Sequence, residues 1–177
     1  MTRQKQQAKA KGRLVGGQTT MVIVPCGVRK IWHQNPQAGR TPANEAYTSH
    51  LFKAYCLYAQ TFGTEWRIVS AKYGIIHPEQ LIENYDCKFD ASYLDPQNWW
   101  RLQGMVLQAR ALPNCERLIL LGGYLYRSIM RKVFSGIYLP SEIVEPFAKC
   151  DLPATIRRLH TDIARAEKRD LLPREPH

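Results

Sequence analysis

Short apolar runs alternate with longer segments of helical periodicity along this chain, and this alternation restricts the folds that it can adopt. Three runs, at residues 21–24, 66–69 and 117–121, have the length and apolar character of buried strands. A fourth run, at residues 142–144, is shorter. Strands separated by helices form a parallel sheet with right-handed crossovers. The sequence therefore predicts a three-layer α/β/α fold with a central, mostly parallel sheet of about four strands.

Helical periodicity fills the segments between these runs. The apolar positions of residues 45–62 fall at helical spacing, and we expect one helix there. A second helix is expected over about residues 95–112, with Trp99 on its buried face. Two more are predicted, one beginning near residue 124 and one over about residues 153–168.

The length of 177 residues suits one sizeable core. We expect a single α/β domain over residues 19–168, a disordered basic tail over residues 1–18 and a C-terminal tail over residues 169–177. No apolar run approaches the roughly eighteen residues of a membrane span, and no signal segment is evident. The five cysteines show no C-x-x-C spacing, and the five histidines show no metal-ligand spacing. We therefore expect a cytoplasmic protein without a metal or a cofactor.

Positive charge dominates the chain, with a formal net charge of +10. Five basic residues lie in the first thirteen positions, and no acidic residue precedes Glu45. This pattern favours a polyanionic partner, because lysine and arginine that neutralise phosphates release condensed counterions. Alternatively, the tail only aids solubility.

Small and polar residues follow three of the predicted strands. Ligands of open α/β sheets bind beyond the carboxyl ends of the strands, where small residues permit close approach. A helix that begins after Gly123 would also offer free N–H groups to an anion. The residues in question are Cys26, Gly27, Ser70, Ala71, Lys72, Tyr73, Gly74, Gly122, Gly123 and Tyr124. The sequence predicts a pocket where these three strand ends meet.

Two carboxylates and a lysine are the best candidates for chemistry in that pocket. Asp86 and Glu83 could orient a water or stabilise a developing cation, although Asp86 could instead cap a turn. Asp90, in an expected loop, could serve in their place. Lys72 could contact a phosphate, neutralise a leaving group or form a Schiff base, or it could simply be solvated. Cys26 could be a nucleophile or a small buried residue. Asn84 could bind a base edge or hold a water.

Aromatic side chains are numerous enough for some to stack on a base or a sugar. We assign Trp32 and Tyr73 to the pocket, and Tyr47 and Tyr126 to the core. The Trp99–Trp100 pair is expected to contribute one core residue and one exposed ring.

Several of these motifs occur together in an uncharacterised family of bacterial and phage domains, which the chain resembles over about residues 21–165. That family usually has the forms C-G-x-x-K, L-Y-x-G-x-x-F, S-A-K-Y-G-L-x-x-P and P-Y-D. The matching residues here are Cys26, Gly27, Lys30, Tyr47, Thr48, Phe52, Ser70 to Gly74, Tyr85, Asp86, Gly122 to Tyr124, Glu145 and Pro146. Ser49 and Asn84 depart from the usual glycine and proline, so Asn84 could mark a specialised site or a neutral change.

The central block also resembles the S-G-L-Y-G-x-L-x-P segment of YaaA-type peroxide-stress proteins, which bind DNA. Within this broad group the chain is similar to Brig-type anti-phage DNA glycosylases, which remove glucosylated hydroxymethylcytosine from phage DNA. That similarity implies a glycosylase-like fold and a DNA glycosylase that acts on double-stranded, modified phage DNA in antiviral defence.

Residue roles for such an enzyme follow from side-chain chemistry. We expect Asp86, Lys72 and Asn84 to be catalytic. The expected substrate-binding residues are Cys26, Gly27, Trp32, Ser70, Tyr73, Glu83, Gly122, Gly123 and Tyr124. Those expected on the DNA backbone are Arg29, Lys30, Arg157 and Arg158. Two alternatives stay open, a non-catalytic DNA-binding stress or repair accessory protein and a small enzyme that processes free nucleotides.

Overall fold

The computed structural model describes residues 18–135, 137, 140 and 142–171. Most of the predicted tails, residues 1–17 and 172–177, lies outside this part of the chain. The main sheet comprises β1 (Thr20–Pro25), β3 (Glu65–Ser70), β4 (Gly74–Ile76), β6 (Arg117–Leu120) and β7 (Glu142–Val144). The α-helices are α1 (Ala43–Ala46), α2 (His50–Phe62), α3 (Gln103–Arg110), α4 (Tyr124–Phe134) and α5 (Leu152–Leu171). Three 3-10 helices span Ile31–His33, Ala91–Leu94 and Pro96–Leu102, and a small ribbon pairs β2 (Thr41–Pro42) with β5 (Leu81–Ile82).

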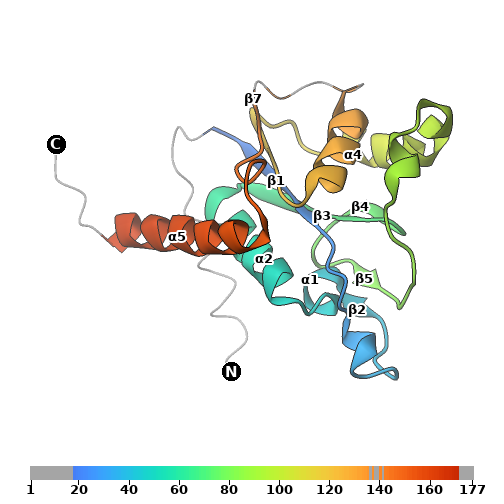
Figure 1. The fold of residues 1–177 in the computed structure, drawn as a ribbon, viewed down its shortest axis with the longest axis horizontal. Helices are drawn as coiled ribbons and strands as arrows, with labels where there is room; N and C mark the ends of the chain where they lie inside the picture. Colours follow the sequence, from blue (N-terminus) through green and yellow to red (C-terminus); the bar gives the residue numbers. More distant parts are fainter. Residues whose placement is uncertain (1–17, 136, 138–139, 141, 172–177) are drawn as a thin grey trace.

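The five strands of the main sheet lie in the order β4-β3-β1-β6-β7 (Figure 1). The β1 strand pairs in parallel with both β3 and β6, and β6 pairs in parallel with β7. Only the edge strand β4 is antiparallel among these pairings. The α/β prediction with a mostly parallel sheet is therefore confirmed. The carboxyl ends of β3, β1 and β6 lie at one edge of the sheet, where α/β proteins bind ligands.

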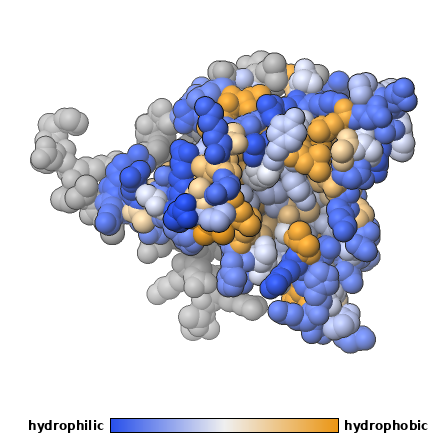
Figure 2. Space-filling view, viewed as in Figure 1, coloured by the Kyte–Doolittle hydropathy of each residue, from blue (hydrophilic) through white to orange (hydrophobic). Residues whose placement is uncertain are grey.

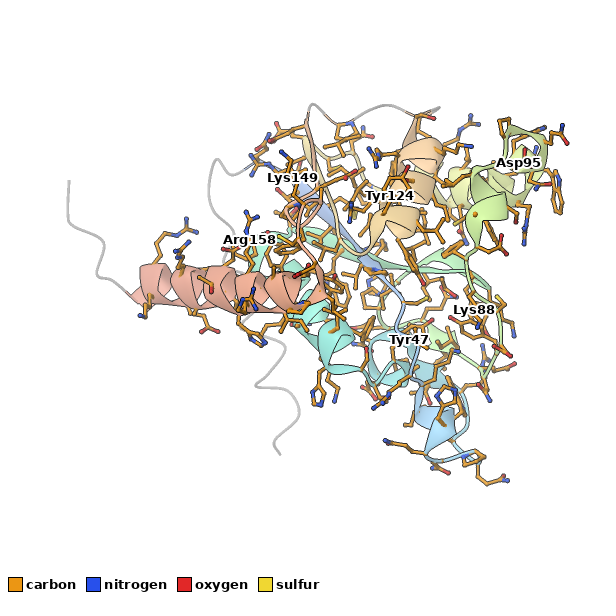
Figure 3. The ribbon with its side chains drawn as sticks, viewed as in Figure 1. Tyr47, Lys88, Asp95, Tyr124, Lys149 and Arg158 are labelled. Atoms are coloured by element: carbon orange, nitrogen blue, oxygen red, sulfur yellow. The ribbon has the colours of Figure 1, made fainter. Side chains whose placement is uncertain are left out.

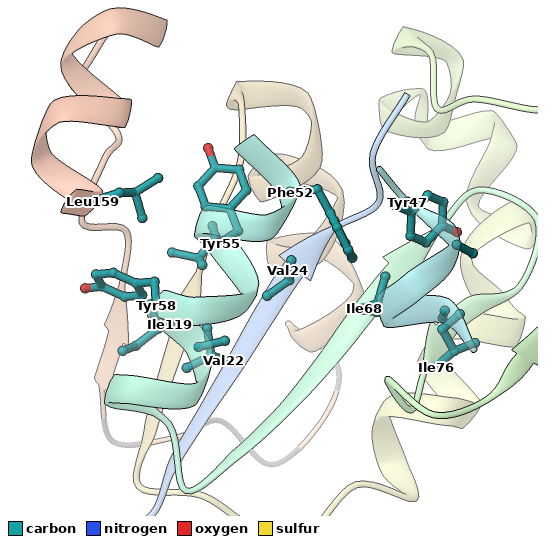
Figure 4. Close-up of a cluster of buried hydrophobic side chains, with 14 of the residues drawn as sticks. Val22, Val24, Tyr47, Phe52, Tyr55, Tyr58, Ile68, Ile76, Ile119 and Leu159 are labelled. Carbon is teal, nitrogen blue, oxygen red and sulfur yellow. The ribbon is translucent and has the colours of Figure 1, made fainter. Parts of the chain in front are cut away.

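Side chains of β1 alternate between the two faces of the sheet, and each face has its own core. Val22 and Val24 lie in a cluster with residues of α2 and α5, part of which Figure 4 shows. Met21 and Ile23 lie in a second cluster with residues of α3 and α4. This two-sided burial explains why the strand is apolar throughout, because both faces of a covered parallel sheet exclude water.

A break divides the helix that we predicted over residues 45–62. The chain is extended at Tyr47, and α2 begins only after Ser49, whose side-chain oxygen accepts a hydrogen bond from the Phe52 N–H at 3.2 Å. Serine is a favoured N-cap because its oxygen satisfies one of the free N–H groups of the first turn. Ser49 therefore starts a new helix and leaves Tyr47 free to point into the core.

The predicted helix over residues 95–112 is also in two parts. Residues Pro96–Leu102 form a 3-10 helix before α3 begins. A 3-10 helix has three residues per turn rather than 3.6, so the expected phase of the buried stripe does not hold. Trp99 is 62% exposed and Trp100 is 61% exposed, and the prediction that Trp99 is a core residue is wrong.

A tight turn joins β3 to the added strand β4 and is held by α3. Gly74 has φ of +72°, and a Cβ atom at this position would overlap the side-chain amide of Gln108. That amide donates to the Tyr73 carbonyl at 2.9 Å and accepts from the Ile75 N–H at 2.7 Å. Glycine is needed here both for its backbone conformation and for its lack of a side chain.

The surface in Figure 2 mixes hydrophilic and hydrophobic side chains, and α5 is largely hydrophilic where it extends beyond the sheet. Within the described residues, none of the helices combines the length and the apolar character needed to cross a membrane.

Candidate active site

A cavity of about 430 Å³ lies where β1 ends. Its lining residues are Cys26, Gly27, Val28, Lys30, His33, Asn84, Tyr85, Asp86, Cys87, Lys88 and Tyr126. This volume falls within the roughly 300–1,000 Å³ of small-molecule sites. Two other concavities measure about 290 Å³, between α2 and α5, and about 110 Å³, behind Met21. The cavity beyond β1 is the largest of the three and the one at a sheet edge that α/β proteins use for ligands.

Tyr85 anchors one wall of this cavity to the core. Its hydroxyl lies 2.7 Å from the Tyr47 hydroxyl and 2.9 Å from Ser70 Oγ, and both partners are fully buried. Ser70 Oγ also accepts hydrogen bonds from the N–H groups of Lys72 at 3.2 Å and Tyr73 at 3.3 Å. With both lone pairs occupied, the Ser70 hydroxyl donates to Tyr85, and the Tyr85 hydroxyl then donates to Tyr47.

The residues on either side of this anchor are exposed and line the cavity. Tyr85 is buried, whereas Asn84 and Asp86 are exposed. Fixing Tyr85 inward therefore presents an amide and a carboxylate to the cavity from one short segment. The structure brings together two of the three residues that we predicted to be catalytic.

The phenols around the cavity are neutral donors and acceptors rather than bases. Burial raises the pKa of Tyr47 to about 12, with a further contribution from Cys26. Burial also raises the pKa values of Tyr85 and Tyr126 well above the ordinary value for tyrosine. Tyr126 Oη lies 3.4 Å from Cys26 Sγ, so this thiol is held at the cavity wall.

Lys30 occupies a position that the sequence did not suggest. We predicted a contact with the DNA backbone, but the residue is only 8% exposed and lines the cavity. Its ammonium donates to the Tyr85 carbonyl oxygen at 3.0 Å and lies 4.3 Å from the centroid of the Tyr85 ring. An isolated antiparallel bridge between Lys30 and Tyr47 fixes the backbone of this residue. Lys30 is therefore part of the site and not of an outer phosphate-binding surface.

Three other predicted site residues surround the cavity without lining it. Lys72 is exposed, with its ammonium 5.2 Å from the Tyr73 ring centroid and 5.8 Å from that of Tyr85. The Tyr73 hydroxyl bonds to the backbone of Glu83, whose carboxylate lies 3.5 Å from Arg40. Tyr73 and Glu83 thus brace the segment that carries the cavity residues.

Two predicted ligand contacts are structural. Ser70 is fully buried, and its hydroxyl forms the hydrogen bonds described above and so positions Tyr85. Trp32 is 4% exposed and its indole N–H donates to the Ala38 carbonyl at 2.6 Å. Trp32 lies in the core rather than on the cavity, because its N–H finds a backbone partner within the same loop.

The third strand end contributes through a residue that we had assigned to the core. Gly122 and Gly123 form the turn into α4, and Tyr124 is 69% exposed, but these three do not line the cavity. Tyr126, two residues further along α4, does line it. The Gly122 carbonyl accepts instead from Arg127, whose side chain also pairs with Glu145 at 2.9 Å.

None of the arginines predicted to contact the DNA backbone lines the cavity. Arg29 is exposed in the loop after β1, between the lining residues Val28 and Lys30. Arg157 and Arg158 are exposed on α5, and Figure 3 shows Arg158 on the opposite side of the view from Lys88. Arg158 lies 4.0 Å from the Asp162 carboxylate, within α5 itself. Any contact of α5 with DNA is therefore made away from the cavity.

Residues 21–153 match the model of a family of unknown function, DUF6884. The chain belongs to this family. It is also 37% identical over 114 residues to the uncharacterized protein YfjM of Bacillus subtilis (strain 168). The aligned residues cover 64% of this chain and 75% of YfjM. Membership of DUF6884 agrees with the expected resemblance to an uncharacterised domain family.

The part of the chain shared with DUF6884 contains the whole cavity. Every lining residue lies between positions 26 and 126, within the matched range of 21–153. Most of α5, with Arg157 and Arg158, lies beyond that range. The cavity therefore lies within the region matched to DUF6884, whereas Arg157 and Arg158 lie outside the matched range.

Proposed function

We propose that this protein is a DNA glycosylase that hydrolyses the N-glycosidic bond of a modified base flipped into the cavity. One observation carries the proposal. Tyr85 is fixed inward, so Asn84 and Asp86 present an amide and a carboxylate to a cavity that also holds Lys30 and Lys88. These groups match the needs of a reaction in which a sugar gains positive charge while a base leaves with negative charge.

The reaction proceeds by attack of water at the sugar C1′ atom. The C1′–N bond breaks, and its electron pair leaves with the base, so the sugar acquires oxocarbenium character. Asp86 stabilises that charge and accepts a proton from the attacking water, whose oxygen forms the new bond to C1′. Asn84, which lines the cavity, donates a hydrogen bond to the departing base, and Lys72 outside the lining adds a nearby positive charge that favours this departure. The base takes up a proton from solvent on release, and Asp86 returns to solvent the proton that it took from water. The products are the free base and an abasic site.

The substrate class that we propose is double-stranded phage DNA with glucosylated hydroxymethylcytosine, as part of antiviral defence. This choice is supported by the resemblance of the central motif to Brig-type glycosylases. A bulky base needs an open entrance, and Val28 at the cavity edge is 85% exposed. Extrusion of a base costs a few kcal/mol, which contacts in the cavity must offset.

Counting abasic sites tests the proposal directly. The protein is incubated with unmodified DNA and with DNA that carries hydroxymethylated or glucosylated cytosine, and aldehyde-reactive labelling counts the sites. Labelling confined to modified DNA is the expected result. The Asp86→Asn variant should then lose about 10²–10⁴-fold in rate. Asp90→Asn is the matched control, since Asp90 is an exposed cap of the Ser92 N–H and does not line the cavity.

A second candidate function is a DNA-binding accessory protein without catalysis. The exposed arginines of α5, which lie away from the cavity, favour it. Binding to DNA that weakens steeply with salt, combined with no base release from any modified DNA, would support this function over the first.

A further inference from the structure

Lys30 is a buried cation with room for another partner. The residue is 8% exposed, and none of the ion pairs among the described residues involves it. A lysine ammonium has three N–H donors. One donates to the Tyr85 carbonyl at 3.0 Å, and the Tyr85 ring lies beneath the ammonium at 4.3 Å. Among the described residues this ammonium has no second hydrogen-bond acceptor, and Lys30 lines the cavity.

Burial of a charge without an opposite charge costs several kcal/mol. A carbonyl dipole and an aromatic face offset part of this cost. An anionic ligand in the cavity would offset more of it, because charge-assisted hydrogen bonds are about twice as strong as neutral ones. Keeping a lysine in this place is therefore best explained by an anion that binds there.

The other charges of the cavity also favour an anion. Lys88 lines the cavity together with Lys30, against one carboxylate, Asp86. Lys72 stands nearby, and the charges of Lys72, Lys30 and Asp86 all act on the Cys87 thiol. These groups therefore lie around one region of the cavity, and positive charge predominates in it.

We propose that Lys30 binds a phosphate group of the nucleotide that occupies this cavity. The inference rests on the proposed function only in that the ligand is a nucleotide, and it holds whether or not a base is released. Phosphate fits better than the departing base, because a phosphate carries its charge before any reaction and so compensates the buried ammonium in the bound state. A departing base would do so only in the transition state.

Ligands with and without phosphate test this inference by binding alone. Calorimetry or NMR titration compares deoxycytidine, deoxycytidine 5′-monophosphate and a trinucleotide whose phosphates are all diesters. We expect the monophosphate, the trinucleotide or both to bind roughly ten- to a hundredfold more tightly than deoxycytidine, the range that charge-assisted hydrogen bonds give. The phosphate-bearing ligand that binds more tightly identifies the source of the phosphate.

The Lys30→Met variant should abolish this preference, because methionine fills a similar volume without the charge. Lys53→Met is the matched control, because Lys53 is an exposed lysine of α2 that does not line the cavity, and this variant should retain the preference. If Lys30→Met does not fold, the 15N resonance of the Lys30 ammonium in the wild-type protein decides. It should shift on addition of the preferred phosphate ligand and not with deoxycytidine.

Equal binding of all three ligands would overturn the inference, as would a full phosphate preference in a folded Lys30→Met protein. A Lys30 15N resonance that does not shift when the phosphate ligand is added would also overturn it. Failure of the glycosylase proposal has a different signature. In that case the phosphate preference and its dependence on Lys30 persist, while no DNA yields abasic sites.

Discussion

Replacement of Tyr85 by phenylalanine removes one buried hydroxyl and tests whether it anchors the cavity. Two hydrogen bonds are lost, to Tyr47 at 2.7 Å and to Ser70 at 2.9 Å. Each contributes about 0.5–1.5 kcal/mol, and the buried partners that lose them add a desolvation cost. Ser70 Oγ keeps the hydrogen bonds that it accepts from two backbone N–H groups, but its own O–H loses its acceptor and the Tyr47 hydroxyl loses its donor. We expect the free energy of unfolding to fall by about 2–4 kcal/mol.

Urea denaturation followed by tryptophan fluorescence measures this loss, with an unchanged slope showing that the same surface is exposed on unfolding. Tyr124→Phe is the control, because that ring is 69% exposed, and its effect should stay within about 0.5 kcal/mol. Hydrogen exchange adds a local readout, since the N–H groups of residues 84–88 should exchange faster in Tyr85→Phe than global unfolding explains. A Tyr85→Phe protein as stable as the control, with unchanged exchange, would refute the anchoring role.

Three further predictions concern stability. Glu145→Ala leaves the buried Arg127 guanidinium without its carboxylate partner at 2.9 Å, and should lower the free energy of unfolding by roughly 3–5 kcal/mol in urea titrations. Gly74→Ala should cost roughly 1–2 kcal/mol for the positive φ alone, and more because the new methyl group displaces Gln108, so its melting temperature should fall more than that of an alanine variant of the exposed Gly104. Burial raises the pKa of Tyr47 to about 12, so the unfolded chain releases this proton first. The stabilisation is complete below about pH 10 and falls by about 1.4 kcal/mol per pH unit between about pH 10 and 12, and Tyr47→Phe should show a shallower loss in denaturation titrations over that range.

The central strands of the fold could be predicted from local patterns in the sequence. The strands at residues 21–24, 66–69 and 117–121 were predictable because a strand buried on both faces is apolar along its whole length. The edge strand β4 was not, because it begins at Gly74, a residue typical of turns and loops. The predicted burial of Trp99 was wrong because a 3-10 segment and an α-helix place the same residues on different faces.

Within the site, the position of a residue beside the cavity is easiest to predict where its own neighbours determine its exposure, while its role stays a prediction. Asn84 and Asp86 flank an aromatic residue, and polar residues on both sides of a buried one are recognisable from the sequence. Lys30 shows the opposite case. Beside Arg29 it looks like half of a basic surface pair, and its burial depends on a carbonyl 55 positions away in the chain. No local pattern could have indicated that contact.

Tyr85 links the stability of the fold to the chemistry of the cavity, because each part of the residue has a separate partner. Its hydroxyl bonds to Tyr47 and Ser70, whereas its carbonyl and ring hold the Lys30 ammonium. A phenylalanine at this position would keep the carbonyl and the ring but lose the hydroxyl. The Lys30 ammonium should then keep its contacts only if the backbone at position 85 does not shift. Ligand affinity and unfolding free energy should therefore fall together in Tyr85→Phe, while Lys30→Met should lower ligand affinity and leave the hydroxyl network intact.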